Sequence, residues 1–155
     1  MTKLQCLKLI KKLEKTYKEK NFPSGVQGFY IRINSKVGVK IYHGEFSRKT
    51  DLKVSDDLYK ANNAHYYMNK FSKINKAPKS YGVYPIKLFG SYHVCMIMEH
   101  ITGRHRELSQ IEDIKLQKIL DKYKTCHGDI WEMNLKVQRN GNVVLLDWDH
   151  AEKWQ

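Results

Sequence analysis

The sequence predicts an α+β protein, because segments with helical periodicity alternate with pairs of strand-like segments. Three segments repeat their apolar residues every three or four positions, and two pairs of segments alternate around short turns. An Asn-Gly turn between alternating apolar runs near the C-terminus adds a hairpin. At 155 residues and 41% hydrophobic content, residues 1–155 are expected to form one domain with a buried core.

The first predicted helix covers residues 2–20. Its apolar residues recur at helical spacing with lysines between them; they are Leu4, Leu7, Ile10, Leu13 and Tyr17. Such a helix can also lie on a membrane or on RNA, but docking on its own domain is the interpretation we favour. Residues 21–25, which read Asn-Phe-Pro-Ser-Gly, end the helix.

The next elements are two strands and a second helix. Residues 28–33 and 37–42 predict a strand pair, in which Lys40 lies on the face opposite the valines. The polar residues 45–54 predict a loop. A helix is then expected from Ser55 to about residue 74, with a serine cap and acidic residues in its first turn.

The remaining elements repeat this pattern. Residues 80–90 and 92–101 predict two strands, and residues 109–124 predict a third helix. The apolar side of that helix is expected to hold Ile111, Ile114, Leu116, Ile119, Leu120 and Tyr123. A hairpin around Arg139-Asn140-Gly141 completes the chain.

The composition is strongly basic, with 28 Lys and Arg against 16 Asp and Glu and a net charge of +12. This excess favours anionic partners such as nucleic acid, nucleotides, acidic lipids or an acidic protein, although a soluble lysine-rich surface explains it equally well. The three cysteines, Cys6, Cys95 and Cys126, form no CxxC pair, which predicts a reducing cytoplasmic location. No signal peptide or membrane span is predicted.

One set of polar residues has the chemistry that phosphoryl transfer needs. That reaction requires a cover and a cation for the phosphates, a carboxylate for the nucleophile, and oxygen ligands for magnesium. The chain offers these parts in order: Gly25 and Gly28, then Lys40, then Asp129, and finally Asn134 with Asp147. The glycines and the lysine are weak signals alone, since ordinary turns and solvated strand lysines are common.

The C-terminal motif is the stronger signal. Asn134 begins the predicted hairpin and Asp147 ends it, and a hairpin brings its two ends together. An amide oxygen and a carboxylate would then meet at one metal ion, with Asp129 on the preceding loop. The plain alternative is that Asp129 caps a turn and Asp147 ends a strand. As an ordered set, these residues favour a phosphate-transfer site.

These motifs resemble the protein-kinase-like superfamily, which includes eukaryotic-type kinases, RIO kinases, the small kinase of the KEOPS complex and aminoglycoside phosphotransferases. The resemblance covers residues 21–150. It implies a protein-kinase-like fold in which residues 21–101 form a small β-sheet N-lobe with a helix, preceded by an N-terminal helix at 1–20. Residues 102–155 would form a truncated C-lobe without the activation segment. The His-Gly-Asp and Asp-Trp motifs resemble those of the atypical members of the superfamily, and the resemblance favours a RIO-like kinase.

The resemblance also implies ATP contacts from the N-lobe. The segment Pro-Ser-Gly-Val-Gln-Gly resembles a glycine-rich loop, so Gly25 and Gly28 would cover the phosphates. The segment Val-Gly-Val-Lys resembles the strand that carries the phosphate-binding lysine, here Lys40. The segment Met-Glu-His-Ile resembles the hinge, which implies Met98 as gatekeeper and the backbones of Glu99 and Ile101 as adenine contacts.

The C-terminal motif implies the catalytic roles. The segment His-Gly-Asp-Ile-Trp-Glu-Met-Asn resembles the catalytic loop, with Asp129 as catalytic aspartate and Asn134 as a magnesium ligand. The segment Leu-Leu-Asp-Trp-Asp makes Asp147 the principal magnesium ligand. The implied cofactors are therefore ATP and Mg²⁺.

Two departures from the family pattern stand out. The helix after Lys40 carries no glutamate to pair with it, and Asn63 falls near that position. Asp56 lies two turns earlier on the same face and could substitute, although we do not favour that role. Only six residues follow Asp149, so either the helix at 109–124 supports the catalytic loop or a partner subunit or second copy does.

The predicted function is an ATP-dependent phosphotransferase acting on protein Ser/Thr with Mg²⁺. The alternatives are a small-molecule phosphotransferase of the aminoglycoside or choline type, and a nucleotide-binding pseudokinase or basic scaffold. A protein substrate is the expected partner, the net charge leaves nucleic acid open as another, and no membrane partner is expected.

Overall fold

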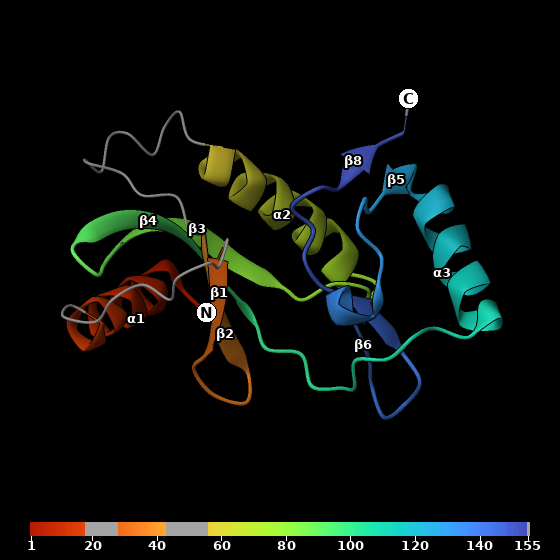
Figure 1. Ribbon diagram of the computed structural model, residues 1–155, viewed down its shortest axis with the longest axis horizontal. Coiled ribbons are helices and arrows are strands. Elements are labelled where there is room, and N and C mark those ends of the chain that lie inside the picture. Colours follow the sequence, from red (N-terminus) through yellow and green to blue (C-terminus); the bar gives the residue numbers. More distant parts are fainter. Residues whose placement is uncertain (18–27, 43–55, 155) are drawn as a thin grey trace.

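A computed structural model describes residues 1–17, 28–42 and 56–154, which form an α+β structure. Figure 1 shows a small sheet with α1 and α2 near it and a second group of elements around α3. The predicted fold class is therefore confirmed at this level. The predicted start of the second helix at Ser55 and the predicted loop at 45–54 lie outside the described residues.

Three α-helices occupy the described part of the chain: α1 (Lys3–Thr16), α2 (Asp56–Ser72) and α3 (Gln110–Lys122). Capping boxes begin two of them. Thr2 caps α1 with Gln5, and Ser109 caps α3 with Glu112. Each box satisfies two backbone donors that the first helical turn leaves without partners.

The sheet consists of β1 (Gly28–Arg32), β2 (Val37–Tyr42), β3 (Ser80–Leu88) and β4 (Ser91–Glu99), all antiparallel. Both predicted strand pairs are present as hairpins. The strand order is β1-β2-β4-β3, so β2 and β4 join the two hairpins in the middle of the sheet. Lys40 on β2 lies opposite Met96 on β4.

The two faces of the sheet bury two separate cores, because side chains alternate along each strand. On β4, Cys95 and Ile97 face the core that α1 covers. Val94, Met96 and Met98 face the other core, which includes α2 and the C-terminal elements. The side of β2 that carries Lys40 and Tyr42 therefore faces the C-terminal half of the chain.

The C-terminal elements are α3, a 3-10 turn (Glu132–Asn134) and two short strand pairs. The predicted hairpin is formed by β6 (Leu135–Val137) and β7 (Val143–Leu145). The other pair, β5 (Thr125–Cys126) with β8 (Glu152–Lys153), was not predicted. It places the segment after Asp149 beside the strand that leads into the loop of Asp129.

The predicted apolar faces of α1 and α3 are wrong in part. Leu4 is 62% exposed and Ile111 is 66% exposed, and Leu7 and Ile114 are exposed as well. On α1 the buried residues are Cys6, Ile10 and Leu13, and on α3 they are Leu116 and Leu120. Each helix meets a surface narrower than its apolar stripe, so the outer residues of the stripe remain in solvent.

Across residues 1–17, 28–42 and 56–154, no helix is both long enough and apolar enough to cross a membrane.

Candidate functional site

An open cleft of about 780 Å³ lies between the sheet and the C-terminal elements. Every predicted site residue that the structure describes lines it: Gly28, Lys40, Met98, Glu99, Ile101, Asp129, Asn134 and Asp147. The predicted residue Gly25 lies outside the described residues. The chain thus brings together side chains that are more than 100 positions apart in the sequence.

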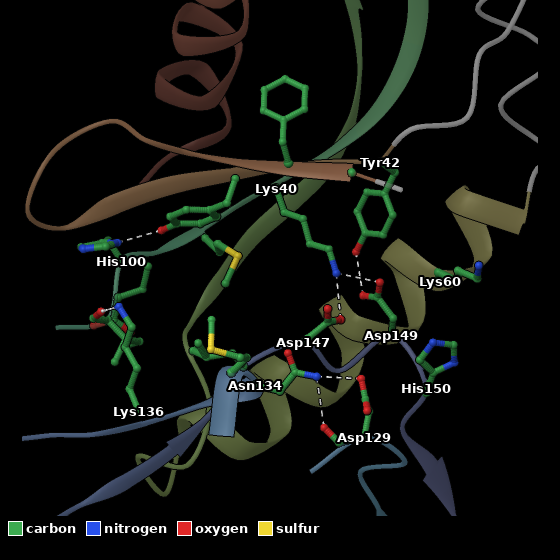
Figure 2. A pocket seen from close by; sticks show the side chains of 18 of the residues that line it. Lys40, Tyr42, Lys60, His100, Asp129, Asn134, Lys136, Asp147, Asp149 and His150 are labelled. Atoms are coloured by element: carbon green, nitrogen blue, oxygen red, sulfur yellow. Dashed lines mark hydrogen bonds and ion pairs between the residues drawn. The ribbon is translucent and has the colours of Figure 1, made fainter. Parts of the chain in front are cut away.

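Lys40 is held by two carboxylates at the centre of this cleft (Figure 2). Its Nζ donates to Oδ1 of Asp147 at 2.8 Å and to Oδ2 of Asp149 at 2.7 Å. The other carboxylate oxygen of Asp149 accepts the hydroxyl of Tyr42 at 2.9 Å. One ammonium group therefore joins two acids from the segment after β7.

The charges of this cluster shift one another's pKa values. Burial alone would lower the pKa of Lys40, but the carboxylates of Asp149 and Asp147 outweigh it and raise that pKa. Burial and repulsion from Asp147 raise the pKa of Asp149. For Asp147, burial also acts to raise the pKa, but the charge and hydrogen bond of Lys40, together with hydrogen bonds from Asp149, outweigh it and lower that pKa. Lys40 is thus charged at neutral pH.

Asp147 is aimed into the cleft by an unusual backbone conformation. Its φ is 38°, in the left-handed region, which aspartate tolerates better than most residues. The residues on either side of it are fixed. Leu146 donates its backbone N–H to the carbonyl of Asn134 at 2.7 Å, and Trp148 is fully buried in the core.

Asp129 and Asn134 form the opposite edge of the cleft. The amide nitrogen of Asn134 donates to Oδ2 of Asp129 at 2.7 Å and to its backbone carbonyl at 3.2 Å. Because the nitrogen is committed to Asp129, the amide oxygen of Asn134 is left for another partner. Figure 2 shows Asn134 between Asp129 and Asp147.

Oxygen atoms suited to magnesium therefore lie in one place. Mg²⁺ prefers carboxylate and amide oxygens and commonly takes its remaining ligands from phosphates and water. Asp147 supplies a carboxylate and Asn134 supplies an amide oxygen, which fits that preference. Among the described residues, no three His, Cys, Asp or Glu side chains cluster in a metal-binding arrangement. Asp147 and Asn134 would therefore supply only some of the ligands of Mg²⁺.

The predicted hinge connects the sheet to the C-terminal elements. Glu99 is fixed to Lys79 twice, through its backbone N–H at 2.8 Å and through its carboxylate, which accepts the Lys79 N–H at 3.1 Å. The carbonyl of Ile101 accepts the ammonium of Lys136 at 2.9 Å. Met98 is buried and lines the cleft.

Gly38 lets an aromatic ring lie across the sheet near the hinge. A Cβ at Gly38 would lie 1.7 Å from the hydroxyl oxygen of Tyr30, so the Tyr30 ring needs the space that glycine leaves. The Tyr30 hydroxyl is hydrogen-bonded to Nδ1 of His100 at 2.9 Å. This pair was not predicted, because the family resemblance gives neither side chain a role and 70 positions separate the two residues.

Asn63 on α2 points toward the acidic segment, and Asp56 does not pair with Lys40. In the described part of the chain, the carboxylates within ion-pair distance of Lys40 are those of Asp147 and Asp149. Asp56 is exposed in the first turn of α2. Asn63 donates its amide to the backbone carbonyls of Asp149 at 3.1 Å and Ala151 at 2.8 Å.

Three solved structures of WbdD share this fold. Monomeric WbdD matches with a TM-score of 0.61 and 13% identity over 82% of this chain and 33% of the WbdD chain. A structure of WbdD as a bifunctional kinase-methyltransferase gives a TM-score of 0.57 and 14% identity over 77% and 29%. The complex of WbdD with the kinase inhibitor LY294002 gives 0.56 and 14% over 81% and 33%.

The fold is similar to that of WbdD. At 13–14% identity this likeness is one of fold, and this chain spans about a third of the WbdD chains. It agrees with the predicted kinase-like arrangement at a coarse level. No protein-family model and no curated protein matches the sequence.

Proposed function

We propose that the protein is an ATP-dependent phosphotransferase that uses Mg²⁺. The observation that carries the proposal is the convergence of Lys40, Asp129, Asn134 and Asp147 on one cleft with a hinge at its back. A cation, a catalytic carboxylate and two oxygen ligands are the parts this reaction needs. The fold likeness to WbdD, a bifunctional kinase-methyltransferase, supports the same class.

Each residue has a role that its position suits. Lys40 holds the phosphates with its charge, and the hinge backbone at Glu99 and Ile101 faces the adenine. Asn134 and Asp147 would hold Mg²⁺, which neutralises charge on the β- and γ-phosphates when bound. Asp129, which Asn134 orients through a 2.7 Å hydrogen bond, accepts the proton of the acceptor hydroxyl.

For the acceptor, we propose the hydroxyl of a protein serine or threonine. The net charge of +12 weighs against a cationic small-molecule acceptor and suits an acidic protein segment. We also propose two further partners. A partner subunit or a second copy of the chain would cover the C-terminal elements, and nucleic acid would bind the basic surface.

Labelled phosphate transfer from [γ-³²P]ATP to casein with Mg²⁺ tests the proposal. Asp129→Ala and Asp147→Ala are each expected to lower the rate by roughly 100-fold or more, the usual size of a lost acid–base or metal interaction. Asp121→Ala, which removes an exposed carboxylate from α3, is the matched control and should stay near the wild-type rate. Equal activity in all four proteins would contradict the assignment.

A further inference from the structure

The helix α2 supplies no acid to the lysine that the phosphates need. Its acidic residues, Asp56 and Asp57, both lie in the first turn, and Asp57 lines the cleft. Among the described residues, however, the ion pairs of Lys40 are those with Asp147 and Asp149. Without a carboxylate partner, a lysine on a strand is free to adopt many rotamers. Some other acid must therefore hold Lys40 in place for the cleft to bind phosphates in a fixed geometry.

We propose that Asp149 is the residue that positions Lys40 on the nucleotide phosphates. This inference rests on the proposed function and adds a residue to which the motif comparison gave no role. Asp149 binds Nζ of Lys40 at 2.7 Å, and its side chain is only 10% exposed. A buried, charge-assisted hydrogen bond of this length holds a lysine more firmly than an exposed pair does.

Two other residues hold Asp149 itself. The Tyr42 hydroxyl donates to the Asp149 oxygen that Lys40 does not use, at 2.9 Å. Asn63 donates to the Asp149 carbonyl and to that of Ala151, so α2 fixes the backbone that carries the acid. The helix thus acts on Lys40 through Asp149, and the missing acid on α2 is replaced from the segment after β7.

Asp147 also binds Lys40 but is suited to a different task. Its side chain is 37% exposed to the cleft, against 10% for Asp149. It is the carboxylate next to the amide oxygen of Asn134, where Mg²⁺ would sit. Asp147 would therefore serve as a ligand of Mg²⁺, and Asp149 would remain the partner that holds Lys40.

A double-mutant cycle between Lys40 and Asp149 tests this assignment. Wild type, Lys40→Met, Asp149→Asn and the double variant are compared for kcat/KM with MgATP. Asp149→Asn should lower kcat/KM at least tenfold in the wild-type background but change it less than about threefold in the Lys40→Met background, because residues acting as one unit are not additive. An equal loss in both backgrounds would show a structural role and overturn the inference.

Two further substitutions separate the proposed role of Asp149 from a general effect on folding or surface charge. Tyr42→Phe removes one support of Asp149 without removing a charge, and should lower kcat/KM several-fold only when Lys40 is present. Asp121→Asn removes an acid from the exposed surface of α3 and should leave kcat/KM unchanged in both the wild-type and the Lys40→Met backgrounds. If Asp149→Asn does not fold, the Tyr42→Phe cycle decides the question, and additive losses there would overturn the inference.

A second readout does not depend on turnover. The dissociation constant of ADP without metal, measured by calorimetry in the same four proteins, should show the same non-additivity. If the wild-type protein transfers phosphate but the effects of the two substitutions are additive, only the role of Asp149 is overturned. Wild type that binds nucleotide but transfers no phosphate overturns the proposed function, and the ADP cycle then decides the role of Asp149. Wild type that binds no nucleotide overturns both.

Discussion

Gly128 gives the loop before Asp129 a shape that no other residue type fits. Its φ is 83°, and a Cβ there would lie 2.7 Å from the backbone carbonyl oxygen of His150. The glycine therefore allows the segment before Asp129 and the segment after Asp147 to pass in close contact. Backbone carbonyls cannot move away as a flexible side chain can, so a substitution must displace one of the two segments.

Gly128→Ala is expected to lower the free energy of unfolding by roughly 2–4 kcal/mol, from left-handed strain and the carbonyl clash together. Gly141→Ala is the matched control, because Gly141 has a φ of 79° but nothing within 4 Å of an added Cβ. It should lose only the strain, about 1 kcal/mol. Urea unfolding of the three proteins measures the difference, and equal losses would contradict the close contact.

His127 is buried and neutral, which links stability to pH. Its Nε2–H donates to the carbonyl of Leu146 at 2.7 Å, and its ring packs edge-on to Trp148. Burial lowers its pKa below the ordinary value of 6.5. Below pH 6.5 the unfolded chain therefore takes up a proton more readily than the folded one, and stability falls as pH decreases.

The free energy of unfolding should decrease from pH 7 to pH 5, with up to about 1.4 kcal/mol per pH unit from one proton. His127→Gln should flatten this decrease, since glutamine does not titrate. His150→Gln is the control, because it replaces an exposed histidine that lines the cleft. A wild-type slope unchanged in His127→Gln would contradict the buried neutral histidine.

At the scale of single residues, the sequence predicted the motif residues but not their partners. Lys40, Asp129, Asn134 and Asp147 could be named because their order and spacing resemble a known pattern. The role of Asp149 could not be found in this way, since its bond to Lys40 joins positions 109 residues apart. Such a contact depends on the packing of the sheet against β7, which no local pattern specifies.

Among the elements, the Asp-Trp-Asp segment is fixed by its central residue. Trp148 is fully buried, stacks on Phe71 of α2 with ring centroids 4.6 Å apart, and donates its indole N–H to the carbonyl of Leu145 at 3.0 Å. It therefore connects α2 with the hairpin that ends at the site. Both acids of the lysine cluster flank this one anchored side chain.

Trp148→Ala should lower the free energy of unfolding by about 3–5 kcal/mol, the usual cost of emptying a large aromatic site in a core. Trp154→Ala removes the same side chain where it is 49% exposed and should cost below about 1 kcal/mol. Denaturant unfolding of both variants tests this. Similar losses would mean that Trp148 does not hold the segment to α2.

Helices and hairpins were predictable to different degrees. The helices and three hairpins follow from local periodicity and turn residues. Their observed bounds lie within a few residues of the predicted ranges, and the largest difference in the helices is the end of α1 at Thr16 instead of residue 20. The pairing of β5 with β8 could not be predicted, because two-residue strands have no periodicity to detect. The faces of α1 and α3 were only partly predictable, since a stripe of apolar residues does not reveal how wide a surface it meets.

For the whole molecule, the cleft lies where two differently built halves meet. The sheet contributes Lys40 from β2, and the C-terminal elements contribute Asp129, Asn134 and Asp147. The strand order β1-β2-β4-β3, which places the strand of Lys40 in the middle of the sheet, was not predictable, because hairpin signals do not say how hairpins join. The predicted meeting of the site residues rested on the motif resemblance, and the fold brings them together.

The thermal stability of the protein with ATP, with and without Mg²⁺, tests the central claim most directly. Ligand at 100 times its dissociation constant stabilises the folded state by about 2.7 kcal/mol, which raises the melting temperature by roughly 5–10 °C in a chain of this size. We expect that rise with MgATP, a smaller one with ATP and EDTA, and no effect of Mg²⁺ in Asp147→Asn. A melting temperature unchanged by MgATP at millimolar concentration would contradict a nucleotide site in this cleft.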